Sequence, residues 1–133
     1  MIVYLDANIV IYVVERHPLW GPRVEARITQ LRAGGDQVAV SDAHRLECLV
    51  GPLILNDPKT LADYLAFFSD PDIITAPITA PVWERAARIR AVHNLRPLDA
   101  LHLAAAAEHG CGRFLTNDVR LIRFPDIPVE VLT

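Results

Sequence analysis

Apolar and polar positions along the chain follow two patterns, one typical of buried strands and one typical of helices. Residues 2–5 form an apolar run without alternation, which is typical of a strand buried on both faces of a sheet. Similar short runs predict further strands at residues 37–40, 72–75, 113–115 and 129–132. We expect the last of these at an edge of the sheet, after a turn at Thr116-Asn117-Asp118.

Apolar residues at helical spacing, separated by capping residues and helix breakers, predict helices between these strands. Asp6 can cap a helix over residues 7–15, which ends before His17-Pro18 because the residue before proline avoids helical geometry. Gly51-Pro52 is expected to break or kink the helix that begins at Ala43. The other helices are predicted at residues 18–33, 57–68, 81–92 and 98–109.

The order of these elements predicts the fold class. Strands that alternate with helices form a parallel sheet with helices on both faces. We therefore expect a three-layer α/β/α domain around a central sheet of four or five short parallel strands. The chain of 133 residues suffices for one domain with a core, and no repeat or linker divides it, so residues 1–133 are taken as a single unit.

Composition narrows the class of protein. Hydrophobic residues make up 52% of the chain, which argues against disorder, yet no apolar run reaches the roughly 18 residues of a membrane helix. The N-terminus lacks a signal-peptide pattern, so we expect a cytoplasmic protein without membrane contact. Cys48 and Cys111 form no CxxC pair, and the histidines show no zinc spacing. The net charge of −3 predicts no general attraction for nucleic acid.

Four carboxylates are expected at one edge of the sheet. Asp6 and Asp118 both follow strands, and the carboxyl ends of parallel strands share one edge. Asp99 lies in the first turn of a helix that leads directly into residues 113–115, so that helix must begin at the same edge. Glu47 lies about 7.5 Å along another helix that begins there, and a glutamate can lean back over that distance.

Each acid also has an ordinary structural explanation. Asp6 can be only a helix cap, Asp99 only a first-turn acid favoured by the helix dipole, and Asp118 only a turn residue. Glu47 is harder to explain, because it lies at the rim of an apolar helix face and a half-buried carboxylate needs a partner. Together the four would repel, and a divalent cation removes that repulsion. Such a cluster without Cys or His is typical of Mg²⁺, with Mn²⁺ as an alternative.

Other polar residues near these acids are candidates for supporting roles. Three arginines each lie two or three residues from an acid: Arg45, Arg96 and Arg120. They are candidates for binding phosphates beside the metal, although surface solvation is the commoner role of a single arginine. His102 lies one turn after Asp99. An interior histidine with satisfied hydrogen bonds is the favoured interpretation of His102, and a bond to Asp99 is the alternative.

Four segments contain these acids, and their order and spacing are specific as a set: Leu5-Asp6-Ala7-Asn8, Arg45-Leu46-Glu47-Cys48, Leu98-Asp99-Ala100-Leu101-His102-Leu103-Ala104 and Leu115-Thr116-Asn117-Asp118. They resemble the four motifs of PIN-domain ribonucleases, with the bacterial VapC-type toxins as the most similar group, over essentially the whole chain. The resemblance implies a Mg²⁺-dependent endoribonuclease that hydrolyses phosphodiester bonds of single-stranded or loop RNA. It also implies a homodimer and a cognate antitoxin protein that blocks the site.

The resemblance assigns roles to individual residues. The family's catalytic, metal-binding quartet carries over onto Asp6, Glu47, Asp99 and Asp118. The polar residue of its last motif falls on Thr116, with Asn8 and Asn117 as further supporting residues, and the three arginines become candidates for RNA phosphates. Arg120 stands where some members of the family have another acid, so the resemblance leaves open whether one or two metals bind.

Two other classes of function share part of this pattern. Phosphoaspartate enzymes and receiver domains also place an aspartate after the first strand. The former would need an aspartate where Asn8 stands and a downstream lysine, and a receiver would need paired acids near the first strand and a lysine late in the chain. Lys59, the only lysine, is in the wrong place for either. The second alternative is a catalytically silent PIN-like domain that only binds RNA or protein, and the intact quartet argues against it.

One apolar stretch has no obvious place in a small core. Residues 49–55 are apolar with little polar relief, and Phe67-Phe68 ends the next helix. An exposed apolar patch usually marks an interface, so we expect a homodimer with residues 53–55 or the helix at 64–68 in contact. The alternative is that both segments pack into the core under the second helix.

Overall fold

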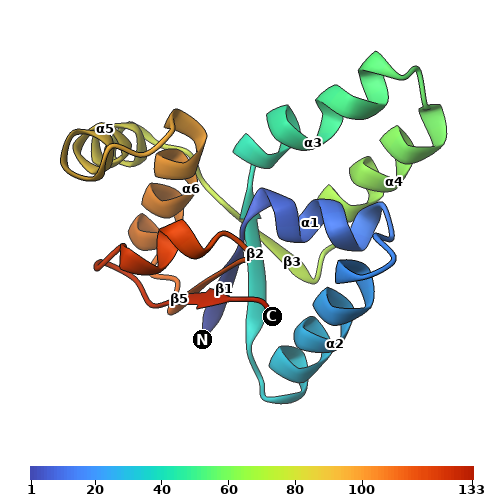
Figure 1. Cartoon of the computed structure of the whole chain (residues 1–133), viewed down its shortest axis with the longest axis horizontal. Coiled ribbons are helices and arrows are strands. Elements are labelled where there is room, and N and C mark those ends of the chain that lie inside the picture. The colour runs from blue at the N-terminus through green and yellow to red at the C-terminus, as the bar shows by residue number, and fades with distance from the viewer.

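The computed structural model describes residues 1–133 and contains a five-stranded sheet with helices on both faces (Figure 1). The strands are β1 (Ile2–Leu5), β2 (Gln37–Ser41), β3 (Ile73–Ala76), β4 (Arg113–Thr116) and β5 (Val129–Val131). They lie in the order β3-β2-β1-β4-β5, and every neighbouring pair is parallel. The predicted three-layer α/β/α fold and the edge position of the last strand are confirmed.

Six α-helices and one 3₁₀ helix connect these strands. They are α1 (Ala7–Val14), α2 (Trp20–Ala33), α3 (Ala43–Ile54), α4 (Pro58–Phe68), α5 (Ala80–His93), α6 (Pro97–Glu108) and the 3₁₀ helix η1 (Val119–Arg123). The sequence predicted the six α-helices to within a few residues, except at the end of α3. It did not predict η1, because so short a helix carries no hydrophobic periodicity.

The helix α3 continues through the predicted break at Gly51-Pro52. Pro52 removes only one backbone donor, and the backbone N–H groups of Leu55 and Asp57 still bond to the carbonyl oxygens of Gly51 and Pro52. The proline ring is buried, so packing offsets the lost hydrogen bond. The chain leaves the helical path only after Ile54, near Asn56, whose φ is 51°.

The two faces of the sheet carry separate cores. Val3 and Leu5 of β1 face a layer made by α1 to α4, whereas Tyr4 faces a layer made by α5, α6 and η1. Figure 1 shows α5 and α6 at one end of the molecule and the α3–α4 pair at the other. Because all three of these β1 residues are fully buried, the prediction that the first strand is covered on both faces is confirmed.

The strand order also predicts where a ligand would bind. The chain runs from β1 to β2 and β3 on one side, and β4 and β5 lie on the other side of β1. Open α/β sheets bind ligands outside the carboxyl ends of the strands at such a reversal. Asp6 follows β1 at this point.

None of the helices combines the length and apolar character needed to cross a membrane.

Candidate active site

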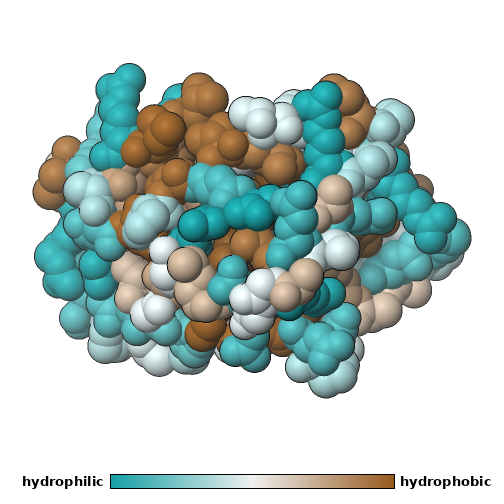
Figure 2. Space-filling view, turned by 90° about the horizontal axis from the view of Figure 1, so that it is seen from below, coloured by the Kyte–Doolittle hydropathy of each residue, from teal (hydrophilic) through white to brown (hydrophobic).

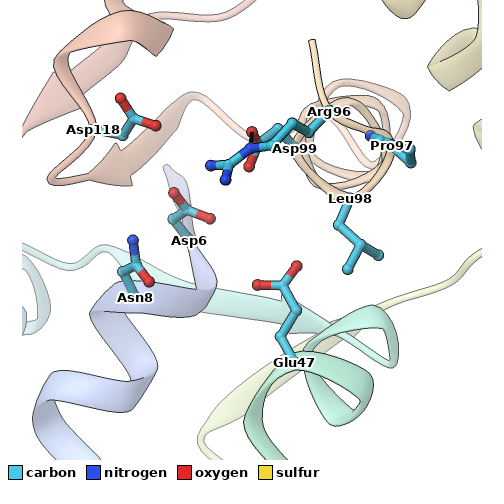
Figure 3. A pocket seen from close by; sticks show the side chains of 8 residues that line it. All are labelled: Asp6, Asn8, Glu47, Arg96, Pro97, Leu98, Asp99 and Asp118. Carbon is cyan, nitrogen blue, oxygen red and sulfur yellow. Dashed lines mark hydrogen bonds and ion pairs between the residues drawn. The ribbon is translucent and has the colours of Figure 1, made fainter.

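A pocket of about 550 Å³ lies at this point of the sheet. Its lining residues are Asp6, Asn8, Glu47, Arg96, Pro97, Leu98, Asp99 and Asp118 (Figure 3). The structure thus brings all four acids that the sequence predicted for this edge to one pocket. They come from four different elements, because Asp6 caps α1, Glu47 lies on α3, Asp99 lies on α6 and Asp118 caps η1.

Asp6 is the most deeply buried of the four acids, with 5% of its surface exposed. Its Oδ1 accepts a hydrogen bond from the backbone N–H of Ala7 at 2.8 Å, which caps α1, and its Oδ2 accepts one from Thr116 Oγ1 at 2.7 Å. Thr116 Oγ1 in turn accepts from the backbone N–H of Asp118 at 3.0 Å. Thr116 therefore holds the first acid in place and links it to the turn that carries the fourth.

Burial raises the pKa of Asp6 above its ordinary value, because desolvation penalises the charged carboxylate, and the negative charge of Asp99 acts in the same direction. The hydrogen bond from Thr116 opposes this shift without cancelling it. The folded protein thus holds a proton on Asp6 more tightly than the unfolded chain does. As the pH rises from the unfolded pKa through the raised one, the metal-free protein loses stability.

We therefore expect Asp6→Asn to raise the melting temperature of the metal-free protein at neutral pH. Asparagine caps a helix as well as aspartate and carries no charge, and each 1 kcal/mol gained is worth about 4 °C for a chain of this size. The gain should shrink as the pH falls toward the ordinary aspartate pKa. Thermal unfolding in EDTA across a pH series measures it, and a gain that does not change with pH would show that charge burial is not the cause.

Glu47 reaches the pocket from the first half of α3, as the sequence predicted. Its Oε1 accepts a hydrogen bond at 3.0 Å from Nε2 of His102, which is fully buried. The favoured interpretation of His102 as an interior histidine is thus confirmed, whereas the alternative bond to Asp99 is wrong. His102 points into the layer between α6 and the sheet and meets α3 there, while Asp99 pairs with an arginine.

Asp99 and Asp118 are each paired with a nearby arginine. Arg96 Nε donates to Asp99 Oδ2 at 3.0 Å, and Arg120 Nε donates to Asp118 Oδ1 at 2.9 Å. The guanidinium group of Arg120 holds the pKa of Asp118 below its ordinary value. Both arginine side chains are largely exposed, so these pairs are surface ion pairs. Arg96 lines the pocket, whereas Arg120 lies outside the lining and reaches its edge through Asp118.

The other predicted polar residues take different positions. Asn8 lines the pocket and lies 3.4 Å from Asn117, which does not line it and donates to the hydroxyl of Tyr12 at 2.6 Å. Arg45 also lies outside the lining. It pairs with Asp42 at 3.0 Å, and its guanidinium group stands over the ring of Phe68. The short separation of Arg45 from Glu47 in the sequence does not determine which way the Arg45 side chain points on α3.

The side chains present fit a hard divalent cation. The acidic side chains of the pocket offer carboxylate oxygens as metal ligands, and no Cys or His lines it. This set of ligands favours Mg²⁺ or Mn²⁺ over Zn²⁺. A cation held by these carboxylates would relieve the burial penalty on the charge of Asp6 and its repulsion by Asp99. In this conformation no three acidic, His or Cys side chains are close enough together to hold a metal unaided. Mg²⁺ sites commonly complete their coordination with waters and substrate phosphates.

Comparison with known proteins supports this description of the fold. The PIN domain family matches residues 3–127, so the chain belongs to the PIN domain family. The VapBC2 structure from Rickettsia felis, bound to a DNA fragment of its promoter, aligns over 100% of both chains with 19% identity and a TM-score of 0.82. A toxin–antitoxin complex from Klebsiella pneumoniae aligns over 98% of both chains with 20% identity and a TM-score of 0.75.

A third solved structure has a stated activity. VapC20 of Mycobacterium tuberculosis, described as a toxin that cleaves the sarcin–ricin loop, covers 84% of this chain and 86% of its own, with 14% identity and a TM-score of 0.69. No curated protein matches the sequence. At these identities the structures establish the shared fold, and the resemblance seen in the four sequence motifs is confirmed at the level of the family.

Proposed function

We propose that this protein is a metal-dependent endoribonuclease that hydrolyses phosphodiester bonds in RNA, and that it is the toxin of a toxin–antitoxin pair. One observation carries the proposal. Four carboxylates from four separate elements line one pocket at the carboxyl edge of the sheet, in a chain that belongs to the PIN domain family. Asp6, Glu47, Asp99 and Asp118 would hold Mg²⁺, and Mn²⁺ would serve as a substitute.

The residues of the pocket divide the work. A bound divalent cation supplies a water of lowered pKa and neutralises charge on the phosphate. Asp6 is fixed by Thr116 and Ala7 and provides a rigid carboxylate at the centre. Arg96 and Arg120 lie at the rim, exposed enough to bind the phosphates of a strand entering the pocket. No serine, cysteine or lysine lines the pocket, so water is the proposed nucleophile.

A cognate antitoxin is the proposed protein partner. The solved structures with this fold include VapBC2 and a toxin–antitoxin complex, both of which contain a toxin together with its antitoxin. An antitoxin that covers the acidic pocket of this chain would complement its charge with basic side chains. RNA is the proposed substrate because the activity stated for VapC20 is cleavage of the sarcin–ricin loop.

Incubation of the purified protein with total RNA tests the proposal. We expect cleavage at defined positions in Mg²⁺ or Mn²⁺ and none in EDTA, with mapping of the cut ends showing the preferred bases. The alternative is a PIN domain that binds RNA without cutting it, and the two arginine–aspartate pairs are compatible with it because they already neutralise half of the acids. Binding without any metal-dependent cleavage would favour that alternative.

The rim arginines give a second prediction. Each protein contact with a phosphate of single-stranded RNA adds about −0.7 to the slope of log affinity against log salt concentration. We therefore expect Arg96→Gln and Arg120→Gln each to weaken binding and to make the slope shallower by about 0.7. Fluorescence anisotropy of a labelled RNA, in an Asp6→Asn background that prevents cleavage, measures it. Lys59→Gln on α4, outside the pocket, is the control, and slopes equal to that control would show that the arginines do not contact phosphate.

A further inference from the structure

A chain of buried polar side chains leads from the core of the sheet to the pocket. Tyr4 Oη lies 2.8 Å from Ser41 Oγ and 2.8 Å from His102 Nδ1, and His102 Nε2 lies 3.0 Å from Glu47 Oε1. Ser41, Tyr4 and His102 are almost completely buried, whereas Glu47 reaches the pocket. Burial of each of these polar groups would cost free energy if it were not hydrogen-bonded. The hydrogen bonds between them therefore help to hold the fold together here.

The donors and acceptors of this chain have one consistent direction. A carboxylate only accepts, so His102 Nε2 must donate to Glu47, and in the neutral ring Nδ1 then accepts from the hydroxyl of Tyr4. Burial raises the pKa of Tyr4, so that hydroxyl keeps its proton. Since the Tyr4 proton is directed at His102, Ser41 Oγ donates to Tyr4. Glu47 thus sets the tautomer of His102, and the hydroxyls of Tyr4 and Ser41, which can donate or accept, complete the chain of hydrogen bonds in that direction.

A second buried histidine packs against the first but serves another purpose. His44 lies with its ring centroid 4.4 Å from that of His102, in an edge-to-face arrangement. Its Nε2 donates to the carbonyl oxygen of Leu5, and its Nδ1 accepts from the backbone N–H of Ser41. Burial lowers its pKa to about 3, so it stays neutral. His44 thus packs against the His102 ring but forms no hydrogen bond with any acid of the pocket.

Glu47 is the acid that most needs such support. Asp6 is short and is held by a backbone N–H and by Thr116, whereas Glu47 has a longer side chain and enters the pocket from the side of α3 (Figure 3). A free glutamate would lose rotamer freedom on binding a cation. His102 is the only protein group that hydrogen-bonds the Glu47 carboxylate, through a single oxygen, and it leaves the other oxygen for the pocket.

We propose that His102 is a positioning residue that orients the Glu47 carboxylate for metal binding, with Tyr4 holding the other ring nitrogen of His102 and Ser41 holding Tyr4. This inference rests on the proposed function, because it assumes that Glu47 is a ligand. Histidine-to-carboxylate contacts of this kind hold metal sites in place, and loss of such a partner typically lowers metal affinity by about 10–100-fold. In the sequence, the sign of this role is Tyr4, a polar residue in an otherwise apolar buried strand. Its partner, His102, lies far along the chain.

Binding of Mn²⁺, followed by electron paramagnetic resonance of the free ion, tests the proposal without reference to cleavage. We expect His102→Leu to weaken binding by about 10–100-fold. His102→Gln should retain most of the affinity, because its amide can donate to Glu47 and accept from Tyr4. Tyr4→Phe, which removes only one hydroxyl, should weaken binding to a smaller extent and decides the matter if His102→Leu fails to fold.

Two comparisons separate positioning from a general effect on the core. His44→Leu disturbs the same cluster without touching Glu47, so equal losses for His44→Leu and His102→Leu would overturn the proposal. In a Glu47→Ala background His102→Leu should cause no further loss, and an additive loss would also overturn it. If wild type binds no Mn²⁺, the proposed function itself is wrong. If His102→Leu and Tyr4→Phe both bind Mn²⁺ with wild-type affinity, only the positioning role of His102 is wrong.

Discussion

Replacement of Asp6 by asparagine is expected to abolish metal-dependent RNA cleavage while the fold survives. Asp6 lies at the centre of the acidic pocket, and both of its oxygens are already fixed by neighbouring groups (Figure 3). Loss of a group that merely supports a ligand lowers activity by about 10–100-fold, so loss of the ligand itself should exceed roughly a hundredfold. The amide of asparagine can still accept from the backbone N–H of Ala7, so the cap on α1 is kept.

The measurement is the initial rate of cleavage of a defined RNA in Mg²⁺, with circular dichroism to verify folding. Asp63→Asn is the matched control, because Asp63 is an exposed aspartate of α4 that pairs only with Lys59 on the surface. Its rate should equal that of wild type. Cleavage at wild-type rate by Asp6→Asn would mean that Asp6 is only a helix cap, and the proposed metal site would then have to be abandoned.

The placement of the acids could be predicted because it follows from topology. Once the strands are known to be parallel, Asp6 and Asp118 must lie at one edge, and the direction of the helix before β4 brings Asp99 there. Glu47 required only the rise of a helix. Chain direction alone thus fixes the edge at which each acid lies, and all four acids line the pocket.

The hydrogen-bond partners of these acids could not be predicted in the same way. His102 lies 55 positions from Glu47 and Tyr4 lies 98 positions from His102, so their contacts depend on how α3, α6 and β1 pack. The pairing of Asp118 with Arg120 depends on η1, a short helix without periodicity. The position of Glu47 at the rim of an apolar helix face showed that it needed a partner, and packing decided that this partner is His102.

The apolar stretch after Glu47 was predicted to meet a partner, and the structure leaves most of it exposed. On the α3–α4 pair six apolar side chains are open to solvent: Leu46, Val50, Leu53, Ile54, Leu55 and Leu65. Tyr64 and Phe68 are instead buried in the core, so only part of the segment 64–68, the alternative predicted contact, is open to solvent, and Leu65 is its exposed large apolar side chain. Figure 2 shows the molecule from below, where the largest group of apolar side chains lies toward the upper left and hydrophilic ones cover much of the rest.

This α3–α4 apolar surface, made by the six side chains, is the expected contact between two copies of the chain. Apolar area of this kind is removed from water when it pairs with itself across a two-fold axis, which is the commonest symmetry of homodimers. Ile54 is 76% exposed near the end of α3. An aspartate there would lie unpaired in the interface, so we expect Ile54→Asp to be a monomer at micromolar concentrations at which wild type is a dimer.

Light scattering coupled to size exclusion measures the mass of each variant. Val92→Asp is the matched control, because Val92 is 75% exposed on α5, in the opposite helical layer of the molecule. If the α3–α4 apolar surface forms the dimer, Val92→Asp should remain dimeric and Ile54→Asp should not. A monomeric wild type, a fully dimeric Ile54→Asp or a monomeric Val92→Asp would each place the contact elsewhere or remove it.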